Sequence, residues 1–468
     1  MIPRRDLLKT LIAASLTSAL PGSMLLSQQA FASSPVPPES AKRFPWKNWS
    51  GNQHCFPAQR LAPKSEAELS ELLRQSTGTV RAVGSGHSFS ALVPSDDTLI
   101  SIRHLNGLAD IDDQRKTATF RAGTLLSETG PLLLANQQAL FNMPDVDQQT
   151  LAGAIATATH GTGRELHSLS GYIDGLSIMT AAGEEIQCSP ERHSELFRAA
   201  QVNLGALGIV TSIRMQNRDA YRLKRETMWL PIDELLPAAE TLSKENRHFE
   251  FFYIPFTGMA LIDTLNITAA AIAKGEELDG NSGVMDLKLA RDTLSWSPKL
   301  RQLIVGSYLK YQSSHSRIDQ SYAIYANNRN VRFNEMEYHL PVETGLQALK
   351  EVIQTLESRF PEVFFPIECR FIKGEEAWLS PFYQRDSLSI AVHRYFEEDY
   401  LPFFKAIEPI FQKHQGRPHW GKWNTFSQQQ SAEIYPKWNE FLALRAEYDP
   451  DGRFLNPYLK DLFGINRS

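Results

Sequence analysis

A short apolar strand runs directly into a glycine turn and a histidine at residues 81–88, which read Arg-Ala-Val-Gly-Ser-Gly-His-Ser. Gly84 and Gly86 flank Ser85 and allow positive φ and close backbone approach, so successive N–H groups can converge on a pyrophosphate. His87 adds a nucleophilic ring nitrogen beside that turn. The segment is not the dinucleotide fingerprint G-x-G-x-x-G, because Phe89 stands three residues after Gly86. By itself it fits either a phosphate-binding turn or an ordinary hairpin turn.

A second segment, residues 151–163, consists almost entirely of small residues and threonines: Leu-Ala-Gly-Ala-Ile-Ala-Thr-Ala-Thr-His-Gly-Thr-Gly. Such a stretch contributes little core volume, so something bulky must lie against its backbone, and a flat ring system would suit. The alternative is a tight helix–sheet contact with a structural histidine at position 160. A third segment, Leu-Gly-Ala-Leu-Gly-Ile-Val, follows at residues 204–210.

The N-terminus has the pattern of an export signal. Arg4-Arg5 precede a moderately apolar run at residues 11–16, and residues 30–32 read Ala-Phe-Ala, a small-x-small cleavage pattern. The run is too short and too rich in Ala, Ser and Thr for a stable membrane span. We predict a twin-arginine signal peptide over residues 1–32, a periplasmic or otherwise exported location, and the twin-arginine translocase as a partner during export. The alternative is a basic N-terminal helix.

Charge and cysteine content exclude some classes of function. The chain has 48 Lys and Arg against 53 Asp and Glu, and the basic residues are scattered, so nothing indicates a nucleic-acid partner. Cys55, Cys188 and Cys369 are odd in number and widely separated, so they cannot all pair within one chain. No C-x-x-C spacing is present, and we predict no metal site.

The pattern of predicted strands and helices changes near the middle of the chain. Ser65 and Glu68 form a capping box that opens a helix with Leu69, Leu72 and Leu73 inward. Predicted strands follow at 80–83, 98–102, 118–123, 175–180 and 205–213, with a helix at 125–138. From about Ala220, aromatic-rich strands such as 249–254 are separated by helices such as 346–360. We place a domain boundary near 216–222.

The three glycine-containing segments occur in an order that resembles the FAD domain of the vanillyl-alcohol-oxidase flavoprotein family. The resemblance implies that His87 attaches FAD covalently through the flavin 8α-methyl carbon. Relatives with a second link carry a cysteine in the segment equivalent to 150–170, and this chain has none there, so a single link is expected. The cofactor-binding residues that it implies are Val83, Gly84, Ser85, Gly86, His87, Ser88, Gly123, Gly153, Ala154, Thr157, Ala158, Thr159, His160, Gly161, Gly163, Gly208, Ile209, Val210, His419 and Lys422.

Motifs in the second half resemble the sugar-1,4-lactone and alditol oxidase branch of that family. They are Ile-Glu-Cys-Arg-Phe at 367–371, Ala-Val-His-Arg-Tyr at 391–395, Arg-Pro-His-Trp-Gly-Lys at 417–422, Asp-Pro at 449–450 and Phe-Leu-Asn-Pro-Tyr at 454–458. The resemblance implies an α+β fold of the vanillyl-alcohol-oxidase / p-cresol-methylhydroxylase type. Its parts would be a two-part FAD-binding domain at 33–218, a substrate (cap) domain at 219–415 with an antiparallel sheet flanked by helices, and a segment at 416–468 that returns to the FAD domain.

The same motifs supply the candidate catalytic residues, which are Glu368, Arg370, Lys422 and His393. On a strand, Glu368 and Arg370 share one face while Cys369 points to the other, so the charged pair can lie over a cavity. An isolated surface ion pair is the alternative. His393 is either a substrate contact and base or a core histidine. Lys422 would stabilise negative charge that develops on the flavin, unless it is merely a solvated lysine.

The expected reaction is FAD-dependent oxidation of a CH–OH group of an aldono-1,4-lactone or alditol by hydride transfer to flavin N5, with O2 as acceptor and H2O2 as product. A periplasmic dehydrogenase that passes electrons to a cytochrome or quinone is the alternative enzyme. A flavin electron-relay protein without turnover of a small substrate is the non-enzymatic alternative, and it would need no charged pair over the ring. The region 220–340, where the resemblance is weakest, leaves the substrate open.

Overall fold

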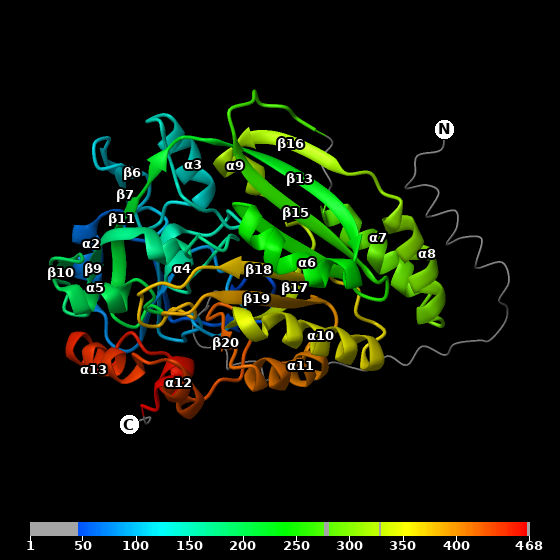
Figure 1. The fold of residues 1–468 in the computed structure, drawn as a ribbon. Coiled ribbons are helices and arrows are strands. Elements are labelled where there is room, and N and C mark those ends of the chain that lie inside the picture. The colour runs from blue at the N-terminus through cyan, green and yellow to red at the C-terminus, as the bar shows by residue number, and fades with distance from the viewer. Residues whose placement is uncertain (1–44, 276–279, 327–328, 466–468) are drawn as a thin grey trace.

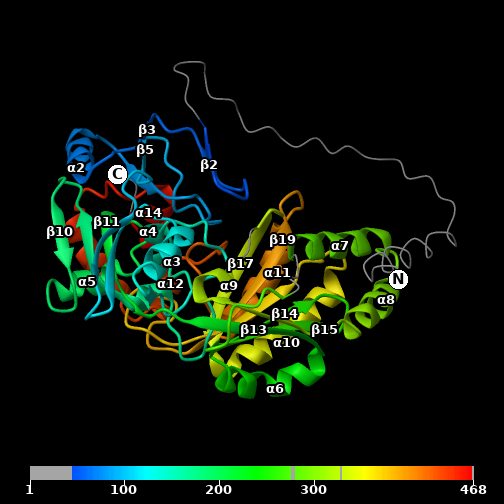
Figure 2. The same ribbon diagram turned by 90° about the horizontal axis from the view of Figure 1, so that it is seen from above.

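The computed structural model describes residues 45–275, 280–326 and 329–465, and the predicted signal peptide lies outside these ranges. The described chain forms two large hydrophobic cores, and the helices and strands that enclose them lie side by side in Figures 1 and 2. The first core draws mainly on the N-terminal and C-terminal parts of the chain, and the second on the middle part. Within the described ranges, no helix is long and apolar enough to cross a membrane.

The first core is built around two sheets. A parallel sheet has the order β3-β5-β4, and an antiparallel sheet has the order β10-β9-β11-β7-β6. Their strands are β3 (Gln59–Leu61), β4 (Val80–Val83), β5 (Thr98–Ser101), β6 (Leu108–Asp112), β7 (Thr117–Arg121), β9 (Ile173–Met179), β10 (Glu185–Cys188) and β11 (Ile209–Gln216). The helices are α2 (Glu66–Gln75), α3 (Leu126–Leu134), α4 (Leu151–Ile155) and α5 (Ser194–Ala200), with a 3-10 turn η1 (Leu169–Tyr172). Two short pairs complete this part: β1 (Trp46–Lys47) with β2 (His54–Cys55), and β8 (Gln138–Ala139) with β12 (Arg218–Asp219).

Local sequence explains where the first helices begin and end. Ser65 caps α2 by accepting a hydrogen bond from the Glu68 N–H at 3.2 Å. Leu69 and Leu73 are fully buried, whereas Leu72 is only half-buried. The helix predicted at 125–138 is shorter, because Gln137 adopts a left-handed backbone with φ +55° and the chain then pairs with β12 as strand β8.

The second core lies beneath a large antiparallel sheet of order β16-β13-β15-β14-β18-β19-β17-β20. Its strands are β13 (Arg222–Pro231), β14 (His248–Ile254), β15 (Met259–Thr268), β16 (His315–Gln320), β17 (Phe333–Pro341), β18 (Ile367–Ile372), β19 (Ser387–Tyr395) and β20 (Arg417–Pro418). Helices α6 (Ile232–Glu245), α10 (Val342–Arg359) and α11 (Leu401–Lys413) pack on one face of the sheet. Helices α7 (Gly280–Thr293) and α8 (Pro298–Lys310) lie at its far end, and α9 (Ser321–Tyr325) follows β16. The predicted α+β class, with an antiparallel sheet flanked by helices in the second part, is confirmed.

Side chains alternate strictly across the central strands of this sheet, as the two-residue period of a strand requires. The alternate residues that enter the second core are Met336, Tyr338, Leu340, Ile367, Cys369, Phe371, Leu388, Ile390 and Val392. The residues between them face away from the helices, and the polar ones are Glu335, Glu337, His339, Glu368, Arg370, Ser389 and His393. This polar face meets the first core, where His160 contacts Glu337.

Later segments of the chain join the two cores. Residues 373–386, which follow β18, place Ala377, Trp378, Leu379 and Phe382 in the first core. The predicted substrate domain at 219–415 therefore contributes to both cores. After β20 the chain packs in the first core through Trp420 and through α12 (Gln428–Ile434), α13 (Trp438–Tyr448) and α14 (Pro457–Phe463).

Arg81 fixes the strand that leads into the glycine turn. Its buried guanidinium donates hydrogen bonds of 2.5–2.8 Å to the carbonyls of Leu92, Leu204, Gly205 and Phe454. These bonds hold the first glycine segment, the third glycine segment and the C-terminal segment at one point. Because β4 and β5 are parallel neighbours, the chain between them makes a crossover, and the alternative of an ordinary hairpin turn at 84–88 is wrong.

Candidate active site

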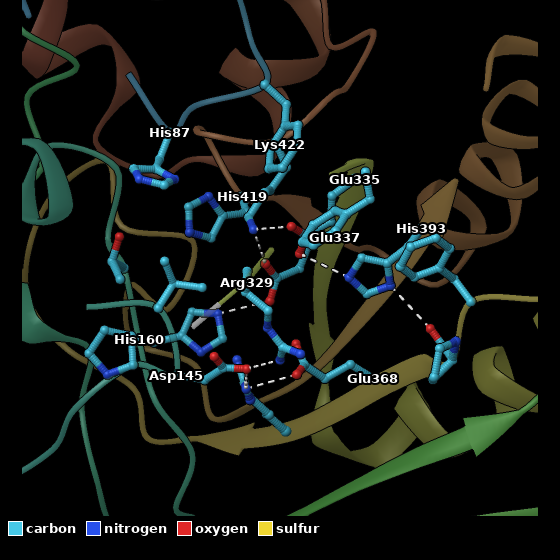
Figure 3. Close-up of a pocket in the computed structure, with 18 of the residues that line it drawn as sticks. His87, Asp145, His160, Arg329, Glu335, Glu337, Glu368, His393, His419 and Lys422 are labelled. Atoms are coloured by element: carbon cyan, nitrogen blue, oxygen red, sulfur yellow. Dashed lines mark hydrogen bonds and ion pairs between the residues drawn. The ribbon is translucent and has the colours of Figure 1, made fainter. Parts of the chain in front are cut away.

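A cavity lies between the polar face of the large sheet and the first core (Figure 3). It encloses about 1000 Å³ that protein atoms do not fill, a volume that includes its opening to solvent. Residues predicted from the sequence come together in its lining: His87, Thr159, His160, Glu368, Arg370, His393, His419 and Lys422. The cavity therefore joins the first glycine segment, the second one and the three C-terminal motifs.

Main-chain atoms of the glycine turn are exposed beside the cavity. Gly84, Ser85 and Gly153 are exposed, although the segments on either side of them are buried. A Cβ atom on Gly84 would lie 2.2 Å from Oγ1 of Thr150, which caps α4, so only glycine permits this approach. Gly86 has φ +69°, again a conformation that favours glycine. The main chain of the turn and of Gly153 is thus accessible beside the cavity, with Val83 and Ser88 at the two ends of the turn.

Several polar atoms in the cavity lining have no partner among the described residues. Buried Oγ1 of Thr159 and Oε1 of Gln149 accept and donate no hydrogen bond there. His419 accepts a hydrogen bond from the Gly421 N–H at its Nδ1 (3.0 Å), so its neutral ring carries the proton at Nε2. Burial lowers the pKa of His419 to about 3, which keeps the ring neutral. These groups are left to bind a ligand.

His87 lies at the edge of the cavity and is half-buried. Its ring stacks on that of Trp49, with centroids 5.7 Å apart. Burial, and then the nearby ammonium of Lys422, lower the pKa of His87 to about 4. The imidazole is therefore neutral at ordinary pH and keeps a nucleophilic lone pair.

Other predicted cofactor contacts lie away from this cavity. A Cβ on Gly123 would meet the Ile102 carbonyl at 2.1 Å, and one on Gly208 would meet Ile178 at 2.5 Å, so both positions need glycine for packing. Ile209 and Val210 pair with β9, while Gly161 and Gly163 pack against neighbouring backbone. Ala154, Thr157 and Ala158 are buried around α4. Contact of these residues with a cofactor stays a prediction.

Lys422 is largely buried, with 20% of its side chain exposed, and it pairs with a carboxylate, so the alternative of a solvated lysine is wrong. Its Nζ forms an ion pair with Glu335, and it lies 3.8 Å from Oε2 of Glu337. Burial lowers the pKa of Lys422, but the two carboxylates outweigh that effect and raise it overall. For Glu335, burial is likewise outweighed by Lys422 and His393, which bring its pKa to about 2. The ammonium therefore stays charged inside the cavity.

His393 projects into the cavity from β19 with a fixed tautomer. Its Nδ1 lies 3.1 Å from the Pro366 carbonyl, which can only accept, so Nδ1 carries the proton of the neutral ring. Its Nε2 lies 3.6 Å from Oε1 of Glu335. The rings of Phe333 and Phe365 pack beside it. The neutral ring thus presents a lone pair at Nε2, which is what a proton acceptor needs.

Glu368 and Arg370 form the expected ion pair inside the cavity, with Nη2 and Oε1 2.8 Å apart, and the alternative of a surface pair is wrong. Nε of Arg370 also donates to Oε2 of Glu250 at 2.7 Å, directly across the β14–β18 pairing. Cys369, between them, is fully buried in the second core. Burial, reinforced by Asp145 and Glu250 and opposed by Arg370, raises the pKa of Glu368 to about 7.

Asp145 and Arg329 complete this charged group. Arg329 forms an ion pair with Asp145, whose Oδ2 also lies 3.6 Å from Nη2 of Arg370. The other oxygen of Asp145, Oδ1, is buried and has no partner among the described residues. An ionised acceptor of this kind in a cavity suits a hydroxyl group of a ligand.

The sequence interpretation missed Glu335, Glu337, Asp145, Glu250 and Arg329. A signal existed for the first two, because Asn-Glu-Met-Glu-Tyr-His at 334–339 alternates charged and apolar residues with the period of a strand, as 367–371 does. Asp145, Glu250 and Arg329 stand singly in the sequence, and only the tertiary fold brings them to Arg370.

His160, Glu337 and His339 have ligand atoms that all lie within 4.8 Å of one another, a spacing compatible with a metal ion. The carboxylate of Glu337 is already engaged by Nε2 of His160 at 2.9 Å and by the hydroxyl of Ser389. Lys422 adds a positive charge nearby. His160 and Glu337 thus belong to a buried hydrogen-bond network beneath the cavity, whereas neither ring nitrogen of His339 has a hydrogen-bond partner among the described residues.

Two family models match the chain, one described as D-arabinono-1,4-lactone oxidase over residues 213–462 and one described as FAD binding domain over residues 57–189. L-gulono-1,4-lactone dehydrogenase of Mycobacterium tuberculosis is 35% identical, with 90% of this chain and 99% of that protein aligned. L-gulonolactone oxidase of Bos taurus is 29% identical (89% and 98% aligned), and alditol oxidase of a Streptomyces species is 27% identical (89% and 98% aligned).

Solved structures show where the fold belongs. Cholesterol oxidase from Brevibacterium sterolicum superposes with a TM-score of 0.74 at 16% identity, over 92% of this chain and 100% of that one. At this identity the likeness concerns the fold alone, and it supports the two-part FAD-binding domain with a cap. The exposed main chain of the glycine turn and the unpartnered polar atoms at Gln149, Thr159 and His419 fit FAD, because a pyrophosphate needs N–H donors and a flavin ring needs hydrogen-bond partners.

Proposed function

The chain belongs to the D-arabinono-1,4-lactone oxidase family, and from this premise we propose that it oxidises a CH–OH group of a sugar-derived aldono-1,4-lactone or alditol. Membership of the family, together with the FAD-binding domain match, makes the chain a FAD-dependent oxidoreductase. The region 220–340, where the sequence resemblance is weakest, supplies Phe252, Val284, Arg329 and Phe333 to the cavity lining, so the substrate preference depends largely on this region.

One observation carries the proposal. Two groups of polar side chains face the same cavity: Glu368 with Arg370 on β18, and His393 on the neighbouring strand β19 with Lys422 from the segment after β20. A polyol or lactone offers several hydroxyls, and the first group supplies both acceptors and donors for them. A flavin relay protein would have no use for a buried charged clamp, since burying these charges costs free energy that binding must recover.

The positions of the side chains in the cavity assign a separate role to each of them. Arg370 and Glu368 bind substrate hydroxyls and orient the reacting carbon. Bound FAD supplies the acceptor for the hydride, at N5 of its ring. His393 accepts the hydroxyl proton at Nε2, the nitrogen that its hydrogen bond to Pro366 leaves unprotonated. Lys422 stabilises the negative charge that develops on that side of the cavity.

His87 is proposed as the single covalent attachment point of FAD. Its support is its neutral, half-buried imidazole at the end of the glycine turn and its place in the cavity lining. A covalent link would retain the cofactor in an exported protein, and a twin-arginine route would let it form before export. The exported, periplasmic location is proposed from residues 1–32 of the sequence, with the twin-arginine translocase as the partner.

O2 is proposed as the electron acceptor, with H2O2 as the product. The second candidate is a dehydrogenase that reduces a cytochrome or quinone, and it is favoured by the relative named L-gulono-1,4-lactone dehydrogenase, which is 35% identical. Stopped-flow mixing of the substrate-reduced enzyme with air separates the two. Rapid return of the flavin absorbance with stoichiometric H2O2 supports the oxidase, whereas slow return that a cytochrome or quinone accelerates supports the dehydrogenase.

The proposed activity is tested by product analysis with a panel of aldono-1,4-lactones and alditols. The wild-type enzyme should convert at least one member, and Glu368→Gln and Arg370→Ala should both lose most of that turnover. Unchanged turnover in both variants would contradict the placement of the substrate between them.

A further inference from the structure

We propose that Glu335 is a positioning residue that stabilises the protonated form of His393 and thereby makes it the base of the reaction. The proposal rests on the proposed function for the identity of the proton donor, a substrate hydroxyl. Glu335 acts through His393, and nothing in the family motifs of this chain points to it.

The sheet register brings the two residues together. Glu335 of β17 and His393 of β19 are directly opposite each other in the antiparallel pairing. Side chains of opposite residues in such a pair are neighbours on one face of the sheet. Oε1 of Glu335 lies 3.6 Å from Nε2 of His393, which is an electrostatic contact rather than a hydrogen bond. The space between them opens into the cavity, since both residues line it.

The ring of His393 can turn neither way without losing a contact. Its Nδ1–H donates to the Pro366 carbonyl at 3.1 Å, and the Phe333 ring meets it edge to face at 5.0 Å. Nε2 is therefore the only nitrogen that can take up a proton. When it does, the new N–H faces the Glu335 carboxylate, which is the state that this carboxylate favours.

Glu335 is itself held as an anion. Its second oxygen pairs with Nζ of Lys422, and its main-chain carbonyl accepts the Trp423 N–H at 3.0 Å. The residue is 4% exposed, so its charge is poorly screened by solvent. The pKa of about 2 that Lys422 and His393 give it, against the opposing effect of burial, means that it carries its charge throughout the working pH range.

The other charges around His393 come from each neighbouring strand. Glu368 of β18 also bears a carboxyl near the ring, and Glu337 lies two residues after Glu335 on the same face of β17. Lys422, from the segment after β20, is the nearby cation, and Glu335 neutralises it by pairing with it. Without Glu335 the imidazolium would lose an anion and would face an ammonium that is paired only with Glu337 at 3.8 Å, and both changes disfavour protonation.

Proton transfer to His393 and hydride transfer to FAD together need no reactant besides the substrate. The substrate O–H bond breaks as an N–H bond forms at Nε2 of His393, while the C–H electron pair leaves as hydride to the FAD of the proposed function. The C=O bond of the product forms from the oxygen electron pair that the O–H bond releases. The proton on His393 returns to solvent through the cavity opening before the next turnover.

The primary experiment needs no substrate. Histidine-selective ¹⁵N labelling of the holoenzyme, with the His393 signal assigned by its absence in His393→Gln, follows the protonation of that ring with pH. In Glu335→Gln, which keeps the size of the side chain, the titration midpoint of His393 should move about one pH unit lower. The matched control is Glu408→Gln, which alters a buried carboxylate that binds Tyr338 and Thr425 away from the cavity. An unchanged midpoint in Glu335→Gln overturns the proposal.

The second measurement uses substrate reduction of the flavin. Glu335→Gln should slow this step about 10- to 100-fold at saturating substrate with little change in KM, and the acid limb of its pH profile should move lower with the NMR midpoint. In a His393→Ala background, Glu335→Gln should slow flavin reduction little further, because the imidazole through which Glu335 acts has been removed. An equal loss in that background overturns the proposal. If Glu335→Gln shifts the NMR midpoint but no lactone or alditol reduces the flavin of the wild-type enzyme, the proposed function is contradicted and the positioning role of Glu335 stands.

Discussion

Glu368 and Arg370 stand two residues apart on β18 and form an ion pair of 2.8 Å in the floor of the cavity. Arg370 simultaneously binds Glu250 on the next strand, and Asp145 approaches it from the first core. Three carboxyl groups thus surround this guanidinium, with Arg329 as the second cation. Burial, reinforced by the Asp145 and Glu250 carboxylates, raises the pKa of Glu368 to about 7, so this carboxyl takes up a proton near neutral pH.

Arg370→Ala should both destabilise the protein and remove substrate binding. It leaves Glu250 and Glu368 buried without their guanidinium, which costs about 3–5 kcal/mol of unfolding free energy. Arg370→Lys keeps the charge but not the two-pronged geometry, so it should retain more stability and still lose at least about tenfold in kcat/KM. Thermal unfolding and steady-state kinetics check both, with exposed Arg359→Ala as the control. Wild-type kcat/KM in Arg370→Lys would contradict a direct role in binding.

Glu368→Gln should change how stability depends on pH. The folded-state pKa of about 7 lies above the unfolded value of 4.5, so the contribution of Glu368 is full below pH 4.5 and is lost as pH rises through 7. The wild type should therefore lose about 3 kcal/mol relative to Glu368→Gln between pH 4.5 and pH 8. Thermal unfolding of both holoenzymes at pH 5 and pH 8.5 measures this. The same difference between them at both pH values would refute the raised pKa.

Lys422→Met should lower both the reaction rate and the midpoint potential of the bound flavin. The ammonium is buried and charged beside the cavity, and removing such a group from a site of developing negative charge typically costs about 10²–10³-fold in rate. Lys422→Arg should preserve most of the potential, because it keeps the charge between Glu335 and Glu337. Spectroelectrochemical titration is the readout, with exposed Lys405→Met as the control. A potential that is unchanged in Lys422→Met would place the ammonium away from the flavin.

His87→Ala should abolish the covalent link without preventing FAD binding. After acid precipitation the wild-type flavin should stay with the protein pellet, and in His87→Ala it should appear in the supernatant. Because the pKa of His87 is lowered to about 4, the link should form at the same rate at every pH above about 5 when apoprotein is mixed with FAD. Exposed His104→Ala is the control. Soluble flavin from the wild type would contradict covalent attachment.

Local sequence was sufficient for part of this site. The strand alternation at 367–371 correctly placed Glu368 and Arg370 on one face and Cys369 in the core, because a two-residue period needs no knowledge of the rest of the fold. The glycine turn at 84–86 was also recognisable, since the close approach of Thr150 to Gly84 admits only glycine.

The remainder depended on contacts between distant segments. Glu335 meets His393 through the register of β17 and β19, and Asp145 meets Arg329 across the two cores, so neither pair has a signature in its own neighbourhood. The helix predicted to reach residue 138 was too long because the left-handed backbone at Gln137 cannot be read from an apolar pattern. Segment 373–386 enters the first core although it lies within the predicted substrate domain, so a single boundary along the chain could not separate the two cores.

The most direct test of the proposed function is the visible absorbance of the purified wild-type holoenzyme after anaerobic mixing with aldono-1,4-lactones and alditols. We predict that at least one of them bleaches the flavin within the turnover time, and that deuterium at the reacting carbon slows the bleaching. A flavin that stays oxidised with every lactone and alditol, while dithionite still reduces it, would contradict the proposed function.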